Sequence, residues 1–178
     1  ADLFVKEDWG DGRINLRCER TGKYVTTISK GRRQSEEEDG ALVAVKDAAF
    51  DWFVTAIFHI IPAENGAVRL TNRFDQPIQI SKDKKLYSAL TGEGSSFLME
   101  TVVDGFEEVQ SLMQCAKTVI LALGCHPMVN AKEEIDRTTL ALPPHQEKLA
   151  KMICKIKPDA ICVLFSNYPY TIHSVQNT

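Results

Sequence analysis

The sequence lacks the features that mark several classes of protein. No apolar run is long enough to span a bilayer, since the longest runs lie at 57–61 and 119–123. Neither sign of charge dominates, because 21 Lys and Arg stand against 24 Asp and Glu, for a net charge of -3. Phosphate backbones and anionic lipid surfaces attract proteins with a clear excess of positive charge. We therefore expect neither a nucleic acid nor a membrane as a partner.

Glycine-rich phosphate loops and metal-ligand spacings are also absent. No segment has the glycine pattern that cradles nucleotide phosphates before a helix. The four histidines show no ligand spacing among themselves or with cysteine. We therefore expect no cofactor and no metal.

Cysteine is present but forms no recognisable framework. The count is five, an odd number, and no two cysteines form a Cys-x-x-Cys pair. Four of them stand in apolar surroundings, at Cys115, Cys125, Cys154 and Cys162. We predict free, buried thiols rather than disulfides or zinc ligands, which indicates a reducing compartment. A cytoplasmic location is the corresponding prediction.

The first half of the chain has the alternating pattern of β-strands. Apolar and polar residues alternate over 12–17, a turn follows at Thr21-Gly22, and 24–28 is rich in β-branched and aromatic residues. Together these segments predict a hairpin. The pattern returns 54 residues later, and its opening returns once more at Phe97 and Gly105. The matched pairs are Phe4 and Phe58, Gly12 and Gly66, Ile14 and Val68, Leu16 and Leu70, and Tyr24 and Ile78.

Hairpins that cannot each bury an apolar face must pack against their copies. We therefore predict a β-trefoil-like domain for residues 1–104, with two full hairpins and one extra strand. The alternative interpretation is a chance similarity between two hairpins, since the matched positions are mostly apolar residues and glycine.

The second half of the chain changes period. Apolar residues recur at helical spacing over 105–117, and the apolar run 118–124 predicts a strand buried on both faces. Pro143-Pro144 opens a second predicted helix, and 160–165 is a second buried strand. A strand, a helix and a strand in this order form a right-handed crossover with parallel strands. Residues 105–178 are thus predicted to form a three-layer α/β half, and the fold class is α+β overall.

A candidate site follows from this topology. Ligands bind beyond the carboxyl ends of parallel strands, which here are the segments after Gly124 and Phe165. The first segment gathers four charged residues, Glu133, Glu134, Asp136 and Arg137. A partly buried Glu beside a second acid can have a raised pKa and donate a proton. A solvated turn is the alternative interpretation of the same residues.

The order of these motifs resembles the C-terminal α/β domain of glycoside hydrolase family 3, which contains β-glucosidases and β-xylosidases. The resemblance covers about residues 105–172. Residues 1–104 are similar to the fascin-like, β-trefoil-like insert of a bacterial branch of the family. The residues that carry the resemblance are Val119–Gly124, Glu133–Arg137, Leu140–Pro144, Gln146, Leu149 and Val163–Ser166, with His126-Pro127 and Tyr168-Pro169-Tyr170 for the bacterial branch.

The resemblance implies a retaining exo-β-glycosidase that acts on a β-glycoside or an oligosaccharide. It implies an Asp nucleophile on an N-terminal barrel of the same chain, with Glu133 as the acid/base and Glu134 as the alternative. Asp136 and Arg137 match a pair that shapes the loop in this family. His126 and Tyr168 either line the site or have only structural roles.

The nucleophile motif is absent, and no (β/α) barrel fits in 178 residues beside these two halves. The chain also begins at Ala1 rather than at Met. We therefore expect a fragment of a larger enzyme that is inactive alone. A carbohydrate-binding or protein-interaction module of β-trefoil type is the alternative. A lectin would need polar groups at equivalent places in each repeat, whereas these repeats share apolar residues.

Overall fold

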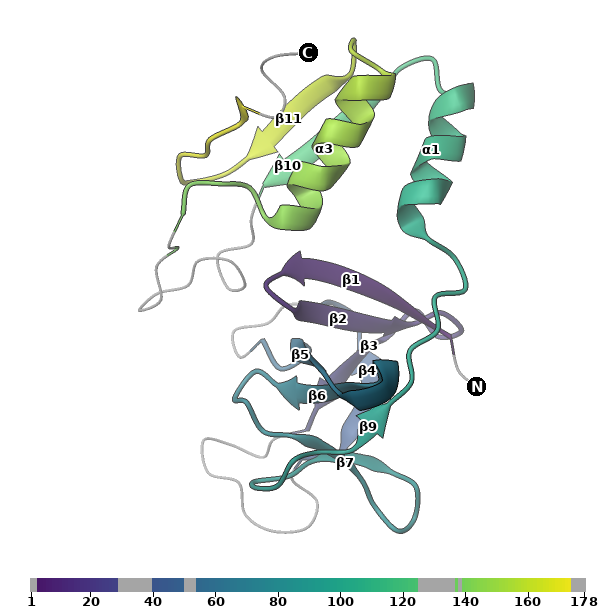
Figure 1. Cartoon of the computed structure of the whole chain (residues 1–178), viewed down its shortest axis with the longest axis vertical. Helices are drawn as coiled ribbons and strands as arrows, with labels where there is room; N and C mark the ends of the chain where they lie inside the picture. Colours follow the sequence, from purple (N-terminus) through teal and green to yellow (C-terminus); the bar gives the residue numbers. More distant parts are fainter. Residues whose placement is uncertain (1–2, 29–39, 50–53, 125–136, 138, 174–178) are drawn as a thin grey trace. The chain divides into compact units, whose positions relative to one another are not determined.

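The structure is a computed structural model that describes residues 3–28, 40–49, 54–124, 137 and 139–173 (Figure 1). The chain divides into two compact units, Ala1–Met99 and Glu100–Thr178. We refer to them as the β unit and the α/β unit. No helix among the described residues is long and apolar enough to cross a membrane.

The β unit consists of antiparallel strands. One sheet has the order β4-β3-β2-β5-β6-β9, with β1 paired to β2, and β7 and β8 form a separate hairpin. A short 3₁₀ turn at Glu64–Gly66 connects β5 to β6. The strands are β1 (Phe4–Gly10), β2 (Arg13–Cys18), β3 (Tyr24–Thr27), β4 (Leu42–Lys46), β5 (Phe58–Pro62), β6 (Val68–Asn72), β7 (Ile78–Ile80), β8 (Leu86–Ser88) and β9 (Ser96–Phe97).

The sequence repeat corresponds to a repeat of structure. Phe4 and Phe58 begin β1 and β5, and each strand forms an antiparallel hairpin with the next. Gly12 and Gly66 stand in the two turns with φ of 73° and 75°, a conformation that favours glycine. The third copy opens with β9 but does not continue as a hairpin. Gly105, the third matched glycine, instead begins a helix.

Both copies contribute to one hydrophobic core. Its buried members are Ile14, Val25, Phe58, Leu70 and Ile78. A polar contact adds to this packing, because the buried Asn15 side chain donates to the carbonyl oxygen of Ala56 at 2.6 Å. The Asn15 Oδ1 accepts from the Trp9 indole N–H at 2.5 Å. The first hairpin is therefore tied to the chain just before β5.

The α/β unit contains two helices and two strands among the described residues. They are α1 (Gly105–Cys115), β10 (Ile120–Gly124), α3 (Pro144–Ile156) and β11 (Ile161–Phe165). Asp104 caps α1, since its Oδ1 accepts from the Phe106 N–H at 2.7 Å. β10 and β11 pair in parallel, from Ile120 opposite Ile161 to Gly124 opposite Phe165.

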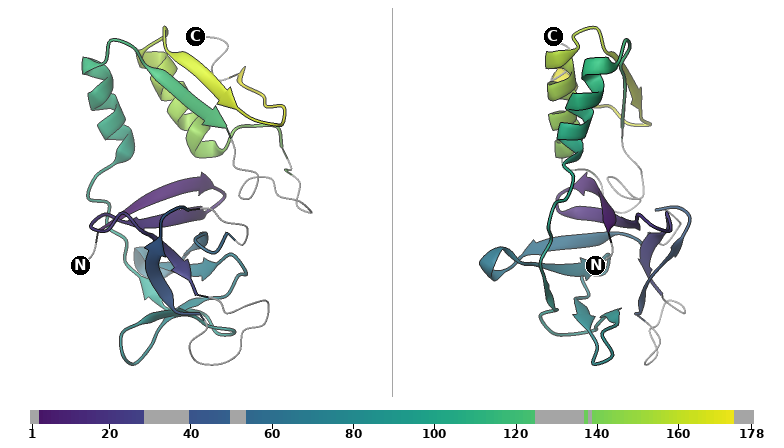
Figure 2. Two further views of the ribbon diagram at one scale, coloured as in Figure 1. Left: turned by 180° about the vertical axis from the view of Figure 1, so that it is seen from behind. Right: turned by 90° about the vertical axis from the view of Figure 1, so that its right-hand side faces the viewer.

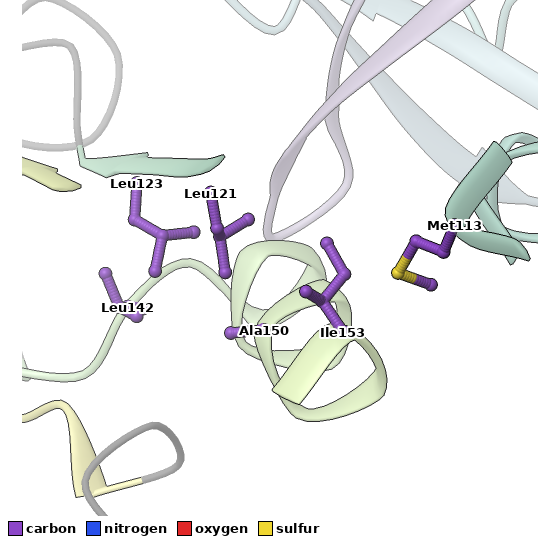
Figure 3. Packing of buried hydrophobic residues seen from close by; sticks show 6 residues of the cluster. All are labelled: Met113, Leu121, Leu123, Leu142, Ala150 and Ile153. Atoms are coloured by element: carbon purple, nitrogen blue, oxygen red, sulfur yellow. The ribbon is translucent and has the colours of Figure 1, made fainter. Parts of the chain in front are cut away.

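One face of the β10–β11 pair packs against α3. Figure 2 shows α3 alongside the β10–β11 pair. Leu121 and Leu123 of β10 are directed toward the residues of α3 and the segment before it, and Met113 of α1 joins the same cluster (Figure 3). The full set of buried residues is Met113, Leu121, Leu123, Leu142, Ala150 and Ile153. This core is separate from that of the β unit.

The expectation that both strands are buried on both faces is wrong. Ile120 is 66% exposed and Phe165 is 65% exposed. Side chains alternate across a strand, so these residues point away from α3, to a side that no described element covers. The described residues of this unit form two layers, and a third layer stays a prediction.

The thiols also differ in part from the prediction. Cys18 and Cys154 are buried and free, whereas Cys115 and Cys162 are free but exposed. Cys125 lies outside the described residues. Apolar neighbours in the sequence predicted burial for Cys115, but the end of a helix that is covered on one side leaves it in solvent.

Candidate functional site

The candidate site lies at the carboxyl ends of β10 and β11, where the chain leaves β10 at Gly124. The side-chain amide of Gln146, in the first turn of α3, pairs with the backbone of this residue. The Gly124 N–H donates to Gln146 Oε1 at 2.9 Å, and Gln146 Nε2 donates to the Gly124 carbonyl oxygen at 2.7 Å. The Gln146 amide thus forms the two hydrogen bonds that the backbone of a neighbouring strand would form. It fixes the backbone at the residue where the loop begins.

Glycine is required at this position by the close approach of the two strands. A Cβ on Gly124 would lie 2.0 Å from the carbonyl oxygen of Phe165, far inside van der Waals contact. Its φ of 155° is also unusual for residues with a side chain. The end of β10 is therefore fixed by backbone packing on one side and by Gln146 on the other.

The segments that follow the two strands run side by side. The Thr171 N–H donates to the Leu140 carbonyl oxygen at 2.8 Å, and Ala141 forms a parallel bridge with Thr171. A turn follows β11, where Ser166 Oγ donates to the Tyr168 carbonyl oxygen at 2.6 Å and accepts from the Tyr168 N–H at 2.9 Å. Leu140 and Ala141, which follow the first loop, are therefore hydrogen-bonded and paired with the segment after β11.

Arg137 joins these two segments. Its guanidinium carbon lies 4.3 Å from the centre of the Tyr170 ring and 5.3 Å from that of Tyr168. Arg137 Nη2 also donates to the Pro169 carbonyl oxygen at 3.1 Å. Arginine suits this place because its planar group can stack on aromatic rings and donate in its plane at once. Two predicted site residues, Arg137 and Tyr168, are thus brought together.

One donor of Arg137 remains unused within the described part of the chain. The Nη1 atom is buried and has no hydrogen-bond partner there. A guanidinium has five N–H donors and pairs most strongly with a carboxylate. The Nη1 atom can therefore donate to an anionic oxygen.

The other predicted site residues lie outside the described residues. These are the acid/base candidates Glu133 and Glu134, together with Asp136 and His126. The structure thus describes the start of the loop at Gly124 and its end at Arg137. No group of three or more His, Cys, Asp and Glu able to hold a metal ion occurs in the part of the chain that is described.

Two residues of the site were not assigned by sequence reasoning. Tyr170 stacks more closely on Arg137 than Tyr168 does, and Gln146 holds Gly124. A Tyr-Pro-Tyr segment after a strand is a weak signal for such a stack, since its partner is 31 residues or more away in the sequence. Gln146 matched the family pattern, but its spacing from Gly124 gave no sign of a direct contact.

The thiol of Cys162, on β11, is a weak nucleophile at neutral pH. Although Cys162 as a whole is exposed, partial desolvation of its sulfur and, after it, the neighbouring Cys154 raise the pKa of the thiol. A raised pKa leaves less thiolate at neutral pH, and the thiolate is the nucleophilic form.

Replacing Arg137 by methionine should lower the free energy of unfolding of the α/β unit by about 1–2 kcal/mol, since a cation–π stack and a hydrogen bond are lost. Lysine should restore little of this, because an ammonium group cannot stack as a plane. Urea unfolding followed by circular dichroism at 222 nm measures the change. The matched control is Lys151→Met, which breaks an exposed pair with Glu147 at 3.0 Å and should cost about 0.5 kcal/mol or less. Equal losses for the two variants would contradict a structural role of Arg137.

Comparison with known proteins supplies a family. The chain matches the family described as "Glycosyl hydrolase family 3 C-terminal domain" over residues 3–178. No curated protein matches the chain. One similar solved structure is the designed 3-fold symmetric protein ThreeFoil, with 14% sequence identity and a TM-score of 0.40. That similarity covers 53% of this chain and 69% of the other.

Proposed function

Because the chain belongs to the family of glycosyl hydrolase family 3 C-terminal domains, we propose that it works as part of a retaining exo-β-glycosidase. The predicted resemblance to this family is confirmed by a match over nearly the whole chain, and it supports a glycoside hydrolase as the full-length protein. The proposed reaction is the hydrolysis of a terminal β-linked sugar from a β-glycoside or an oligosaccharide.

The proposed contribution of this chain is the acid/base loop. In a retaining mechanism one carboxylate attacks the anomeric carbon, while a second carboxyl group protonates the leaving oxygen and then activates water. We assign the second role to Glu133, with Glu134 as the alternative. The nucleophile is assigned to a barrel domain N-terminal to this chain in the same polypeptide.

The described geometry supports this assignment through the two ends of the loop. The segment 125–136 follows Gly124, which pairs with Gln146, and precedes Arg137, which lies over two tyrosine rings. A loop held at both ends has fewer conformations to lose when a carboxyl group must be positioned. This anchoring of both ends is the single observation that carries the proposal.

Arg137 has a second proposed role, as a partner for the loop's acids. Its buried Nη1 has no hydrogen-bond partner among the described residues and is four positions from Glu133 in the sequence. We propose that a loop carboxylate, with Asp136 as the first candidate, accepts from this atom. A nearby guanidinium keeps such a carboxylate ionised. With Asp136 held ionised in this way, the acid/base role is left to Glu133 or Glu134.

The remaining assignments follow the family. We assign residues 1–104 to an inserted β-trefoil-like domain and residues 105–178 to part of a three-layer α/β domain. A carbohydrate-binding role of the β unit has less support, because the residues shared by its repeats form the buried core. The four free thiols among the described residues support a cytoplasmic location.

The acid/base assignment is tested in the longer protein that joins this chain to a barrel. Glu133→Gln should lower kcat about a hundredfold or more on substrates with poor leaving groups, because these need a proton from the enzyme. Aryl glycosides with acidic leaving groups should lose less, and azide should restore their turnover by replacing water as the nucleophile. Steady-state kinetics with the two substrate classes measures this difference.

Two further variants complete this experiment. Glu134→Gln should be nearly neutral if Glu133 is the acid/base, and the pattern reverses if Glu134 has that role. Glu147→Gln serves as the control, since Glu147 lies on α3 and pairs with Lys151 at the surface. Full activity of both Glu133→Gln and Glu134→Gln would show that the loop does not supply the acid/base. The 178-residue chain alone should show no turnover.

A further inference from the structure

The second strand of one repeat copy pairs with the first strand of the next copy at two places in the β unit. We call each such pairing a junction. β2 pairs with β5 through Ile14 opposite Phe58. β6 pairs with β9 through Val68 opposite Phe97. Ile14 and Val68 are equivalent in the repeat, and so are the two phenylalanines, of which Phe58 begins β5 and Phe97 ends β9. The corresponding third junction would place an aliphatic residue opposite Phe4, at the start of β1.

Strand directions allow one further strand to complete this pattern. The sequence of paired strands β1, β2, β5, β6 and β9 is antiparallel at every step. β1 and β9 therefore run in the same direction, so a single strand running against both can pair antiparallel with each. Such a strand would be the sixth and would close the path into a ring, which removes both open edges.

The residues at the two open edges are apolar and exposed. Phe58 is fully buried at 0% exposure, whereas its counterpart Phe4 is 45% exposed. Directly after β9, at the other edge, Leu98 is 85% exposed and Met99 is 45% exposed. These two follow Phe97 as His59 and Ile60 follow Phe58, and the latter two pair with β6. Exposed apolar residues at sheet edges are typical of a surface to which another polypeptide segment binds.

The described part of this chain does not supply the missing strand. In the first two copies a glycine with positive φ turns the chain into the second strand. In the third copy Asp104 caps a helix and Gly105 is its first residue, so the chain leaves the sheet. The two segments with the second-strand pattern are already paired as β2 and β6.

We infer that the β unit binds an extended polypeptide segment with the pattern Gly-x-(Ile or Val)-x-Leu, which pairs between β9 and β1. The pattern is that of Gly12, Ile14 and Leu16 in one copy and Gly66, Val68 and Leu70 in the other. Backbone hydrogen bonds would provide affinity, and the aliphatic residue opposite Phe4 would provide register, as in other cases of strand addition. A second copy of this chain is not the proposed occupant, because its own strands of this pattern are in use.

The experiment uses a fluorescein-labelled peptide with the sequence of Glu64–Ile80, which contains one copy of the pattern and no cysteine. The peptide is titrated into the full 178-residue chain and followed by fluorescence anisotropy. Saturable binding is expected. A peptide with aspartate in place of the residues equivalent to Val68 and Leu70 should bind at least tenfold more weakly. Hydrogen exchange should show new protection in β1 and β9.

A matched pair of protein variants locates the binding. Phe4→Asp should weaken binding of the peptide at least tenfold, because a carboxylate then stands at the junction. Phe74→Asp should change it less than twofold, since Phe74 is also exposed, at 60%, but lies in the β6–β7 turn. Circular dichroism of both variants confirms that they are folded.

Three results of the binding experiment would overturn the inference. They are the absence of saturable binding, equal binding of the aspartate-containing peptide, and new protection confined to strands other than β1 and β9. A dimer in sedimentation velocity that Phe4→Asp dissociates would also overturn it, because a second copy would then cover the edge. None of these results depends on glycosidase activity, so the inference and the proposed function fail independently.

Discussion

Replacing Phe58 by alanine should lower the free energy of unfolding of the β unit by about 3–5 kcal/mol, the usual cost of removing a buried aromatic ring. Phe58 is completely buried and lies in the strand that pairs with both β2 and β6. Its removal leaves a cavity between the two copies of the repeat. A loss of this size is a large fraction of the stability of a small domain, so the β unit should unfold at low denaturant concentration.

Tryptophan fluorescence measures this effect selectively. Both tryptophans of the chain, Trp9 and Trp52, belong to residues 1–99. The control is Phe4→Ala, because Phe4 is the repeat counterpart of Phe58 but is 45% exposed. It should cost less than about 1 kcal/mol, in proportion to the smaller area that it buries. Equal losses of stability for Phe58→Ala and Phe4→Ala would mean that the two side chains are equally buried, which would contradict the structure.

The second large effect is expected for Gly124→Ala. The added Cβ would lie 2.0 Å from the Phe165 carbonyl oxygen, so β10 and β11 could not keep their present separation. Either the pairing of the strand ends or the contact with Gln146 must be lost. We expect the free energy of unfolding of the α/β unit to fall by about 3 kcal/mol or more, because the clash is with backbone and strain at such positions is expensive.

Circular dichroism at 222 nm during urea unfolding follows this unit, because α1 and α3 are its helices. Gly105→Ala is the control. A Cβ there meets nothing within 4 Å, and alanine is the better helix former by about 0.5–1 kcal/mol. That variant should be neutral or slightly stabilised. If the Gly124→Ala variant were as stable as the Gly105→Ala variant, the close approach of β10 and β11 at Gly124 would be contradicted. In the longer protein Gly124→Ala should also reduce activity, since the loop starts at this residue.

The repeat of the β unit was predictable from the sequence because its pattern is local. Alternating apolar residues and turn glycines follow from the geometry of single hairpins, and the offset between Phe4 and Phe58 relates the two copies. The different burial of these two residues was not predictable. The burial of each phenylalanine depends on which strands pair beside it. The third copy supplies no second strand, because the chain begins a helix after Asp104.

The candidate site was predicted in part. A crossover of two parallel strands predicts where a site lies, so Arg137 and Tyr168 could be placed at the same edge. The stack of Arg137 on Tyr170 and the pairing of Gln146 with Gly124 could not be predicted, because they join residues that are distant in sequence. The length of the apolar runs predicted buried strands, but exposure of Ile120 and Phe165 depends on what covers the second face.

The sequence by itself determined the repeat, the family and the helix–strand–helix–strand order of residues 105–165, because each of these rests on residues at fixed spacings along the chain. The tertiary structure alone decided which edges stay open and which side chains hold the loop ends. Pairing and packing depend on distances between segments, and no spacing in a sequence specifies these. Gly124 combines the two levels: its residue type is visible in the sequence, and the reason for it is a carbonyl oxygen of the neighbouring strand.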